Sequence, residues 1–163
     1  TTLFQKGFRP AIDFGLSVSR IGNRAQCQAM RELSGKLRLE YLQYQELLRM
    51  TSMKAELSAD AESKLRRGEL VSRLFTQSKA LPSSLAEQVI FLYAIRRGVL
   101  DTVPQLWQRF KLNVFAWIKK AHPEIPRKIQ EQQALSPGLK QQLDEALAEY
   151  LRQEEAAPTE PAP

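Results

Sequence analysis

Residues 84–98 read Ser-Leu-Ala-Glu-Gln-Val-Ile-Phe-Leu-Tyr-Ala-Ile-Arg-Arg-Gly. Ser84 and Glu87 have the spacing of a capping box, in which the serine bonds an amide of the first helical turn and the glutamate reaches back. From Val89 to Ile95 every residue is apolar or aromatic, which is typical of a helix buried on several sides. Gly98 suits the left-handed geometry that ends many helices. The stretch therefore predicts the central helix of a helical bundle.

The chain on either side of this stretch also shows helical spacing. Apolar residues recur at steps of three and four from Ala25 to about Met50, and Ser58 can cap a second helix that closes near Phe75. Thr102–Gln105 is another capping-box match, with a proline in the first turn where it costs nothing. The pattern predicts an all-α helical bundle over residues 24–155, with helices over about 25–50, 58–75, 85–98, 102–122, 124–132 and 136–155.

The two ends of the chain differ from this bundle. Thr1–Gln5 reads as an extended stretch, and no downstream strand is predicted to pair with it. Residues 1–23 are therefore expected to complete a sheet or an interface that another chain or an upstream part supplies. Residues 156–163 hold three prolines and no aliphatic side chain larger than alanine, which predicts a disordered tail.

Composition limits the classes of protein to consider. A chain of 163 residues fits one compact domain, and its longest apolar run, Val89–Ile95, is too short to span a bilayer. The lone Cys27 excludes an internal disulfide and is expected to be a small buried side chain. The net charge of +6 is spread over scattered basic pairs, which favours a solvated surface over a stripe that binds nucleic acid.

Arg20 is the residue with the clearest chemical potential. It lies in a glycine-bracketed, serine-rich loop, Gly15–Gly22, which can point a guanidinium outward. The planar fork and permanent charge of arginine match the oxygens of a transferring phosphoryl group, while an ion pair with a carboxylate is the structural alternative. The sequence holds no Gly-x-x-x-x-Gly-Lys-Ser/Thr motif, so the usual cradle for a triphosphate is missing from it.

The segment around Arg20 also carries a family resemblance. Residues 8–22, Phe-Arg-Pro-Ala-Ile-Asp-Phe-Gly-Leu-Ser-Val-Ser-Arg-Ile-Gly, resemble the arginine-finger segment in the alpha subunit of the rotary ATP synthase. Further matches cover nearly the whole chain in the family's order and spacing, among them Gly35–Leu37, Gln43–Tyr44, Arg67–Gly68, Glu87–Val89, Gly98–Asp101 and His122–Glu124. The chain thus resembles the C-terminal part of an alpha subunit.

The resemblance implies an organisation and a set of partners. Residues 1–23 would be the C-terminal end of a nucleotide-binding domain whose P-loop lies upstream, and the bundle would surround the central stalk. The implied ligand is ATP or ADP with Mg²⁺, the metal being held by parts outside this chain. The implied partners are the upstream alpha-subunit piece, the beta subunits and the gamma central stalk, with no nucleic acid. The implied location is peripheral, on the matrix side of the mitochondrial inner membrane, with a bacterial or plastid membrane as the alternative.

The resemblance assigns catalytic roles to two residues. Arg20 matches the arginine that reaches into the neighbouring beta site, and Ser17 occupies a position of the same loop that matters for activity. An arginine finger of this kind can be worth roughly 10³ to 10⁵ in rate. The chain would therefore be inactive alone and act as one part of a multisubunit enzyme.

Other matched residues belong to the adenine pocket that the resemblance implies for alpha's own nucleotide. Arg9 and Pro10 match the pair that packs against adenine, and Gln77 matches the first glutamine of a Gln-x-Gln pair. Lys79 replaces the second glutamine, so its ammonium is a candidate for a phosphate or ribose contact. The chain also departs from the family at Lys54–Ser58, where relatives often carry an acidic loop facing the stalk.

Two further features have plainer interpretations. His122 is expected to be a C-terminal cap favoured by the helix dipole, and not a ligand or a base. Trp107, Phe110, Val114 and Trp117 trace one helical face, which indicates core packing and not a platform for stacking bases. Two rival functions stay open beside the alpha-subunit interpretation: a basic helical module that binds nucleic acid, and a free-standing interaction bundle.

Overall fold

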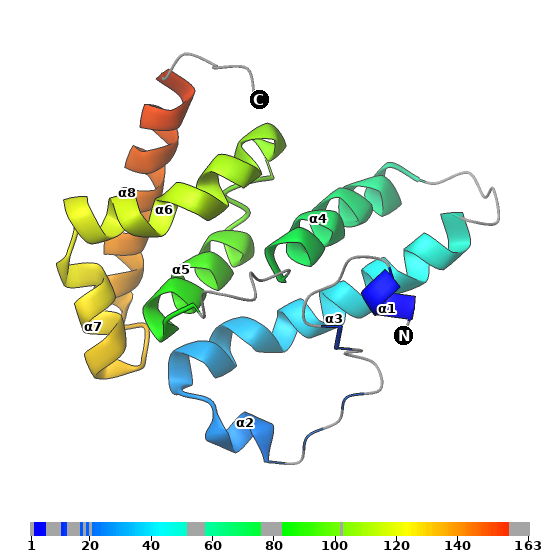
Figure 1. The fold of residues 1–163 in the computed structure, drawn as a ribbon, viewed down its shortest axis with the longest axis horizontal. Helices are drawn as coiled ribbons and strands as arrows, with labels where there is room; N and C mark the ends of the chain where they lie inside the picture. Colours follow the sequence, from blue (N-terminus) through cyan, green and yellow to red (C-terminus); the bar gives the residue numbers. More distant parts are fainter. Residues whose placement is uncertain are drawn as a thin grey trace. The chain divides into compact units, whose positions relative to one another are not determined.

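The computed structural model describes residues 2–5, 11–12, 17, 19, 21–51, 58–75, 83–101 and 103–156. Every regular element over these ranges is helical, which confirms the all-α prediction (Figure 1). The length of the sequence suggested one domain. In the structure, contacts between residues divide the protein into two compact units, Thr1–Ser84 and Leu85–Pro163. Each unit has its own apolar core. The predicted boundary at residue 23 stays a prediction.

The first unit is built around an antiparallel helix pair. Helix α3 (Gln28–Thr51) and helix α4 (Ala59–Phe75) run side by side in opposite directions (Figure 1). Each helix buries one side in the core of this unit. On α3 the buried residues follow one another at steps of four and three, and on α4 the buried apolar residues are Leu70 and Val71. The buried stripe of α3 consists of Ala29, Leu33, Leu37, Tyr41 and Tyr44.

Of the two long helices of this unit, α4 begins at the predicted cap and α3 begins later than predicted. Helix α4 begins one residue after Ser58, whose Oγ accepts the amide of Ala61 at 3.3 Å, so the predicted N-cap is confirmed. Helix α3 begins at Gln28, three residues later than the spacing suggested. Cys27 precedes it and is only half-buried, so the prediction of a buried cysteine is wrong, because this position is a link between two helices.

Gly68 allows the two helices to approach closely. A Cβ built on Gly68 would lie 2.3 Å from Cγ and 2.4 Å from Cβ of Tyr44. Rotation about χ2 turns the ring about the bond between these two atoms, so it leaves both in place and cannot relieve the clash. The crossing of α3 and α4 therefore needs a residue without a side chain at position 68.

Two short helices precede this pair: α1 (Thr2–Gln5) and α2 (Gly22–Ala25). The expected extended stretch over Thr1–Gln5 is thus wrong for Thr2–Gln5. A strand without a neighbour leaves its backbone groups unpaired, whereas one helical turn pairs them locally.

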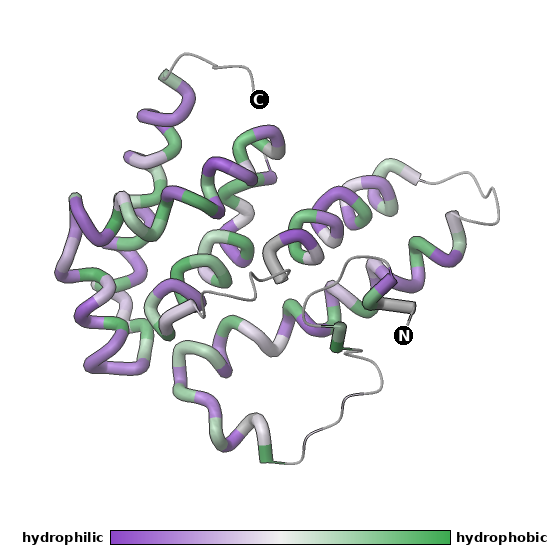
Figure 2. The backbone as a smooth tube through the Cα atoms, viewed as in Figure 1, coloured by the Kyte–Doolittle hydropathy of each residue, from purple (hydrophilic) through white to green (hydrophobic). Residues whose placement is uncertain are grey.

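The second unit contains the central helix that the opening stretch predicts. Helix α5 (Leu85–Arg96) packs against α6 (Trp107–Ala121) and α7 (Glu124–Gln132), and side chains bond it to α8 (Pro137–Ala156). A short 3₁₀ turn, η1 (Pro104–Leu106), leads into α6. Hydrophobic and hydrophilic residues alternate along α6 and α8 (Figure 2), as expected of helices with one face in a core. The fully buried side chains include Val89, Ile90, Phe110, Val114, Ile118, Ile125, Ile129, Leu143 and Leu147.

The predicted aromatic face of α6 does pack in this core. Phe110 is fully buried with its ring centroid 5.8 Å from that of Tyr150, and Trp117 lies 5.5 Å from the same ring. The edge-on geometry of both contacts is the favoured one for aromatic pairs. The core interpretation is confirmed for Phe110 and Val114, which are fully buried, whereas Trp107 and Trp117 are half-buried.

The ends of these helices use the predicted residues. Gly98 has a φ of 67°, the left-handed geometry expected after α5. Ser136 Oγ accepts the amide of Leu139 at 3.3 Å, with Pro137 as the first residue of α8. Helix α8 extends through Ala156, so the predicted tail begins at least one residue too early, and residues 157–163 lie outside the described part of the protein. No helix among the described residues is both long enough and apolar enough to span a membrane.

Candidate functional site

One of the predicted site residues, Ser17, is described by the structure. Arg20 and the adenine-pocket candidates Arg9, Pro10, Gln77 and Lys79 lie outside the described residues, as does the Lys54–Ser58 loop up to its last residue. Ser17 is exposed. Its carbonyl oxygen accepts a hydrogen bond of 3.1 Å from Nη2 of Arg38, which comes from helix α3.

Ser19 caps a turn that leads into α2. The Oγ of Ser19 accepts the amide N–H of Gly22 at 2.8 Å, three residues on. The carbonyl of Ile21 then accepts the amides of Arg24 at 2.8 Å and Ala25 at 3.1 Å, which starts α2. A Cβ on Gly22 would lie 2.8 Å from Ser19 Oγ, so glycine keeps this turn tight.

Gln26 is the C-cap of α2, and its side chain is bonded to α3. Its amide donates to the carbonyl of Gly22 at 3.2 Å, and its backbone then turns extended, with a φ of −73° and a ψ of 142°. The Oγ of Ser34 donates to Oε1 of Gln26 at 3.3 Å. The described residues around position 20, which are 17, 19 and 21–26 and are called the finger segment below, are therefore bonded to α3 at Ser17 and at Gln26.

The surroundings of the finger segment favour anions. From Ser17 through Arg38 the sequence holds five basic residues and one acidic residue, Glu32. Arg24, Arg31 and Arg38 are all exposed. A local excess of exposed positive charge raises the concentration of an anionic ligand near it.

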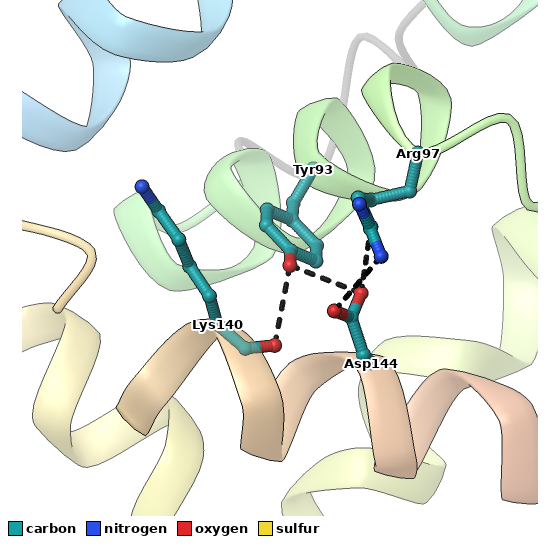
Figure 3. Close-up of polar contacts among 4 residues, drawn as sticks. All are labelled: Tyr93, Arg97, Lys140 and Asp144. Carbon is teal, nitrogen blue, oxygen red and sulfur yellow. Dashed lines mark hydrogen bonds and ion pairs between the residues drawn. The ribbon is translucent and has the colours of Figure 1, made fainter. Parts of the chain in front are cut away.

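The second unit holds a polar cluster that joins α5 to α8 (Figure 3). The hydroxyl of Tyr93 lies 3.2 Å from the carbonyl oxygen of Lys140 and 3.0 Å from Oδ1 of Asp144. Arg97 donates to both oxygens of Asp144, from Nε at 2.9 Å and from Nη2 at 3.1 Å. The bond to Asp144, and then its charge, raise the pKa of the Arg97 guanidinium. Each of these groups bonds to at least one other member of the cluster, which is the arrangement of a structural link between helices.

His122 has the capping role that the sequence predicts. It is the C-cap of α6, and its amide donates to the carbonyl of Ile118 at 2.8 Å. Its Nε2 lies 3.1 Å from Oε2 of Glu149, and its ring centroid lies 5.5 Å from that of Trp117. Across the described residues, no group of three or more histidine, cysteine or acidic side chains could hold a metal ion.

Tyr150 is a buried phenol of the second unit. Its hydroxyl donates to the carbonyl of Arg109 at 3.3 Å, and it is buried between α6 and α8. Burial, and then the bond to Glu154, raise the pKa of Tyr150 well above its ordinary value. Nε of Arg109 lies 2.9 Å from Oε2 of Glu154, which keeps this carboxylate paired.

The sequence did not predict Arg38, Ser34 or the cluster around Asp144. These contacts join residues 8 to 51 positions apart. The available signal was weak. Ser34 and Arg38 share a face of α3, and Arg97 follows the last residue of α5 four positions after Tyr93, but spacing alone names no partner for either pair.

Comparison with known proteins identifies the family. Residues 26–150 match the family model of the ATP synthase alpha/beta chain, C terminal domain. The protein is 40% identical over 148 residues to the ATP synthase subunit alpha of Lawsonia intracellularis, an alignment that includes 90% of this sequence and 29% of that one. It is 36% identical over 152 residues to the protein of the same name from Petrotoga mobilis, with 93% of this sequence and 30% of that one aligned.

A third relative agrees with these two. The ATP synthase subunit alpha of Mycobacterium sp. strain KMS is 38% identical over 151 residues, with 92% of this sequence and 28% of that one aligned. The chain thus spans less than a third of the length of these bacterial relatives. It is similar over about nine-tenths of its own length to alpha subunits, and it belongs to the family defined by the C-terminal domain of the ATP synthase alpha and beta subunits.

Proposed function

We propose that this protein is the C-terminal part of the alpha subunit of a proton-translocating rotary ATP synthase, and that Arg20 acts in trans at the catalytic site of a neighbouring beta subunit. The observation that carries the proposal is the family match over residues 26–150 together with the arginine-finger motif just upstream of it. The described bonds of Ser17, Ser19 and Gly22 support it, because they hold the backbone on both sides of position 20.

The proposed chemistry is electrostatic. The guanidinium of Arg20 neutralises charge that builds on the γ-phosphoryl oxygens as the terminal phosphoryl group is transferred. Its fixed charge and paired donors suit two of those oxygens at once, which the single ammonium of a lysine cannot reproduce. The chain binds no catalytic nucleotide of its own in this scheme, so turnover requires the assembled complex.

The test is the Arg20→Lys variant in the assembled complex. We expect multisite ATP hydrolysis to fall by about 10³-fold or more, while nucleotide binding stays near that of the wild type. Arg24→Lys is the matched control, since Arg24 is an exposed arginine of the same segment and should keep full turnover. Wild-type turnover in Arg20→Lys would defeat the assignment.

The second part of the proposal concerns alpha's own nucleotide. Arg9, Pro10 and Gln77 would contribute to a pocket for the adenine of ATP or ADP with Mg²⁺, and Lys79 would contact a phosphate or the ribose. The support is the residue-by-residue match stated above. Retention of nucleotide on the non-catalytic sites should drop in Gln77→Ala, and unchanged retention would remove this residue from the pocket.

The assembly follows from the same proposal. The partners would be an upstream alpha-subunit piece, beta subunits and the gamma stalk, on a membrane-bound complex. The relatives named above are bacterial, and the matrix face of the mitochondrial inner membrane stays a prediction that cell fractionation tests. Mass spectrometry of the native complex tests the assembly itself, and a complex that lacks this polypeptide would refute it.

The described surface does not favour the nucleic-acid alternative. Several basic residues of the first unit are paired with carboxylates: Arg67 with Glu40 at 3.1 Å, Lys64 with Asp60 at 2.6 Å, and Arg73 with Glu69. A stripe that binds phosphates keeps its cations available, whereas these are shared with acids.

A further inference from the structure

Helix α3 bonds the finger segment at two points on one of its faces. Ser34 and Arg38 are four residues apart, so their side chains lie one above the other on the helix. Ser34 bonds the side chain of Gln26, at the end of the segment, and Arg38 bonds the carbonyl of Ser17, at its start. The two bonds thus connect a regular helix to the two flanks of the serine-capped turn.

The bond from Arg38 is the more informative of the two. It joins residues 21 positions apart and reaches a backbone atom, so it fixes the path of the backbone whatever residue stands at position 17. The adjacent face of α3 is anchored in the core by Leu33 and Leu37, which are 1% and 2% exposed. Arg38 therefore transmits the position of a rigid helix to the start of the finger segment.

We propose that Arg38 is a positioning residue for the arginine finger, with Ser34 as its companion at the other end of the segment. This inference rests on the proposed function of Arg20. A reacting group that is displaced by about 1 Å can lose about 10²-fold in rate, so a bond that fixes the backbone three residues before the finger matters for catalysis without touching nucleotide.

The first measurement is local order in the full-length protein. Arg38→Met removes the guanidinium donors but keeps a long side chain, and Arg38→Lys keeps one charged donor. Amide hydrogen exchange at Gly22 and over residues 21–25 should become about tenfold faster in Arg38→Met and should return towards the wild-type rate in Arg38→Lys. Arg31→Met, at another exposed arginine of α3, is the control and should leave this exchange unchanged. Unchanged exchange in Arg38→Met would overturn the proposal.

The second measurement is catalysis in the assembled complex. We expect kcat of Arg38→Met to fall by about 10- to 100-fold with KM for nucleotide near its wild-type value, and Arg38→Lys to restore most of the loss. If exchange rises and Arg20→Lys abolishes turnover while Arg38→Met keeps full kcat, the positioning role is refuted and the finger assignment stands. If Arg20→Lys itself turns over normally, the finger assignment fails and this inference fails with it.

Discussion

Replacing Gly68 by alanine tests the close crossing of α3 and α4. The added Cβ would lie 2.3 Å from Cγ, 2.4 Å from Cβ and 2.5 Å from Cδ2 of Tyr44. Optimal carbon contacts are about 3.5 to 4.0 Å, so the two helices have to separate by about 1 Å or Tyr44 has to leave its position. Tyr44 is 8% exposed and belongs to the buried stripe of α3, so either response disturbs the core of the first unit.

Two opposing terms set the size of the effect. Overpacking of a filled core costs about 1 to 3 kcal/mol, while alanine in place of glycine inside a helix returns about 1 kcal/mol. Gly35, in the middle of α3, has no atom within 4 Å of a Cβ built on it. Gly35→Ala should therefore raise the free energy of unfolding by about 0.5 to 1 kcal/mol. The free energy of unfolding of Gly68→Ala should be about 1 to 3 kcal/mol lower than that of Gly35→Ala.

The assay is denaturant unfolding of the full-length protein, followed by circular dichroism, for both variants and the wild type. Hydrogen exchange of the α3 and α4 amides assigns the change to the first unit, because these amides should lose protection in Gly68→Ala and keep it in Gly35→Ala. If the two variants show the same free energy of unfolding, the close approach of Gly68 and Tyr44 does not exist in solution.

Two further predictions concern the second unit. Tyr93→Phe removes the hydroxyl that bonds Lys140 and Asp144, and it should lower the free energy of unfolding by about 1 kcal/mol in a chemical denaturation experiment; no loss would show that the hydroxyl does not contribute to the α5–α8 link. Tyr150 has a raised pKa in the folded protein, so its contribution to stability is fully present below the unfolded pKa of about 10 and is lost as the pH rises further. The free energy of unfolding, measured at several pH values across that alkaline range, should fall less steeply with pH in Tyr150→Phe than in the wild type. Identical slopes would contradict the burial of this phenol.

The sequence predicted the elements whose signals are local. Ser58 and Ser136 cap the helices that follow them, and Gly98 takes the left-handed geometry, because each of these roles depends on residues within one helical turn. The short helix at Thr2–Gln5 was missed because four residues are too few to show a period.

Contacts between distant residues could not be predicted in the same way. The bonds from Arg38 to Ser17 and from Arg97 to Asp144 depend on how helices pack, and sequence spacing carries no information on which polar side chains then meet. Of the predicted catalytic and adenine-binding residues, the structure describes Ser17, and it adds Arg38 beside it. The roles of Arg20, Arg9, Pro10, Gln77 and Lys79 stay predictions that rest on the family motif.

The position of the two tryptophans gives the molecule a built-in optical reporter. Trp107 and Trp117 both belong to α6, and Trp117 lies against His122 and Tyr150, so indole fluorescence reports on the second unit. The first unit contains the tyrosine pair Tyr41 and Tyr44, with ring centroids 6.1 Å apart, and no tryptophan. Indole emission therefore follows the melting of the second unit alone, without any added dye, and its comparison with a signal from both units, such as circular dichroism, separates the two.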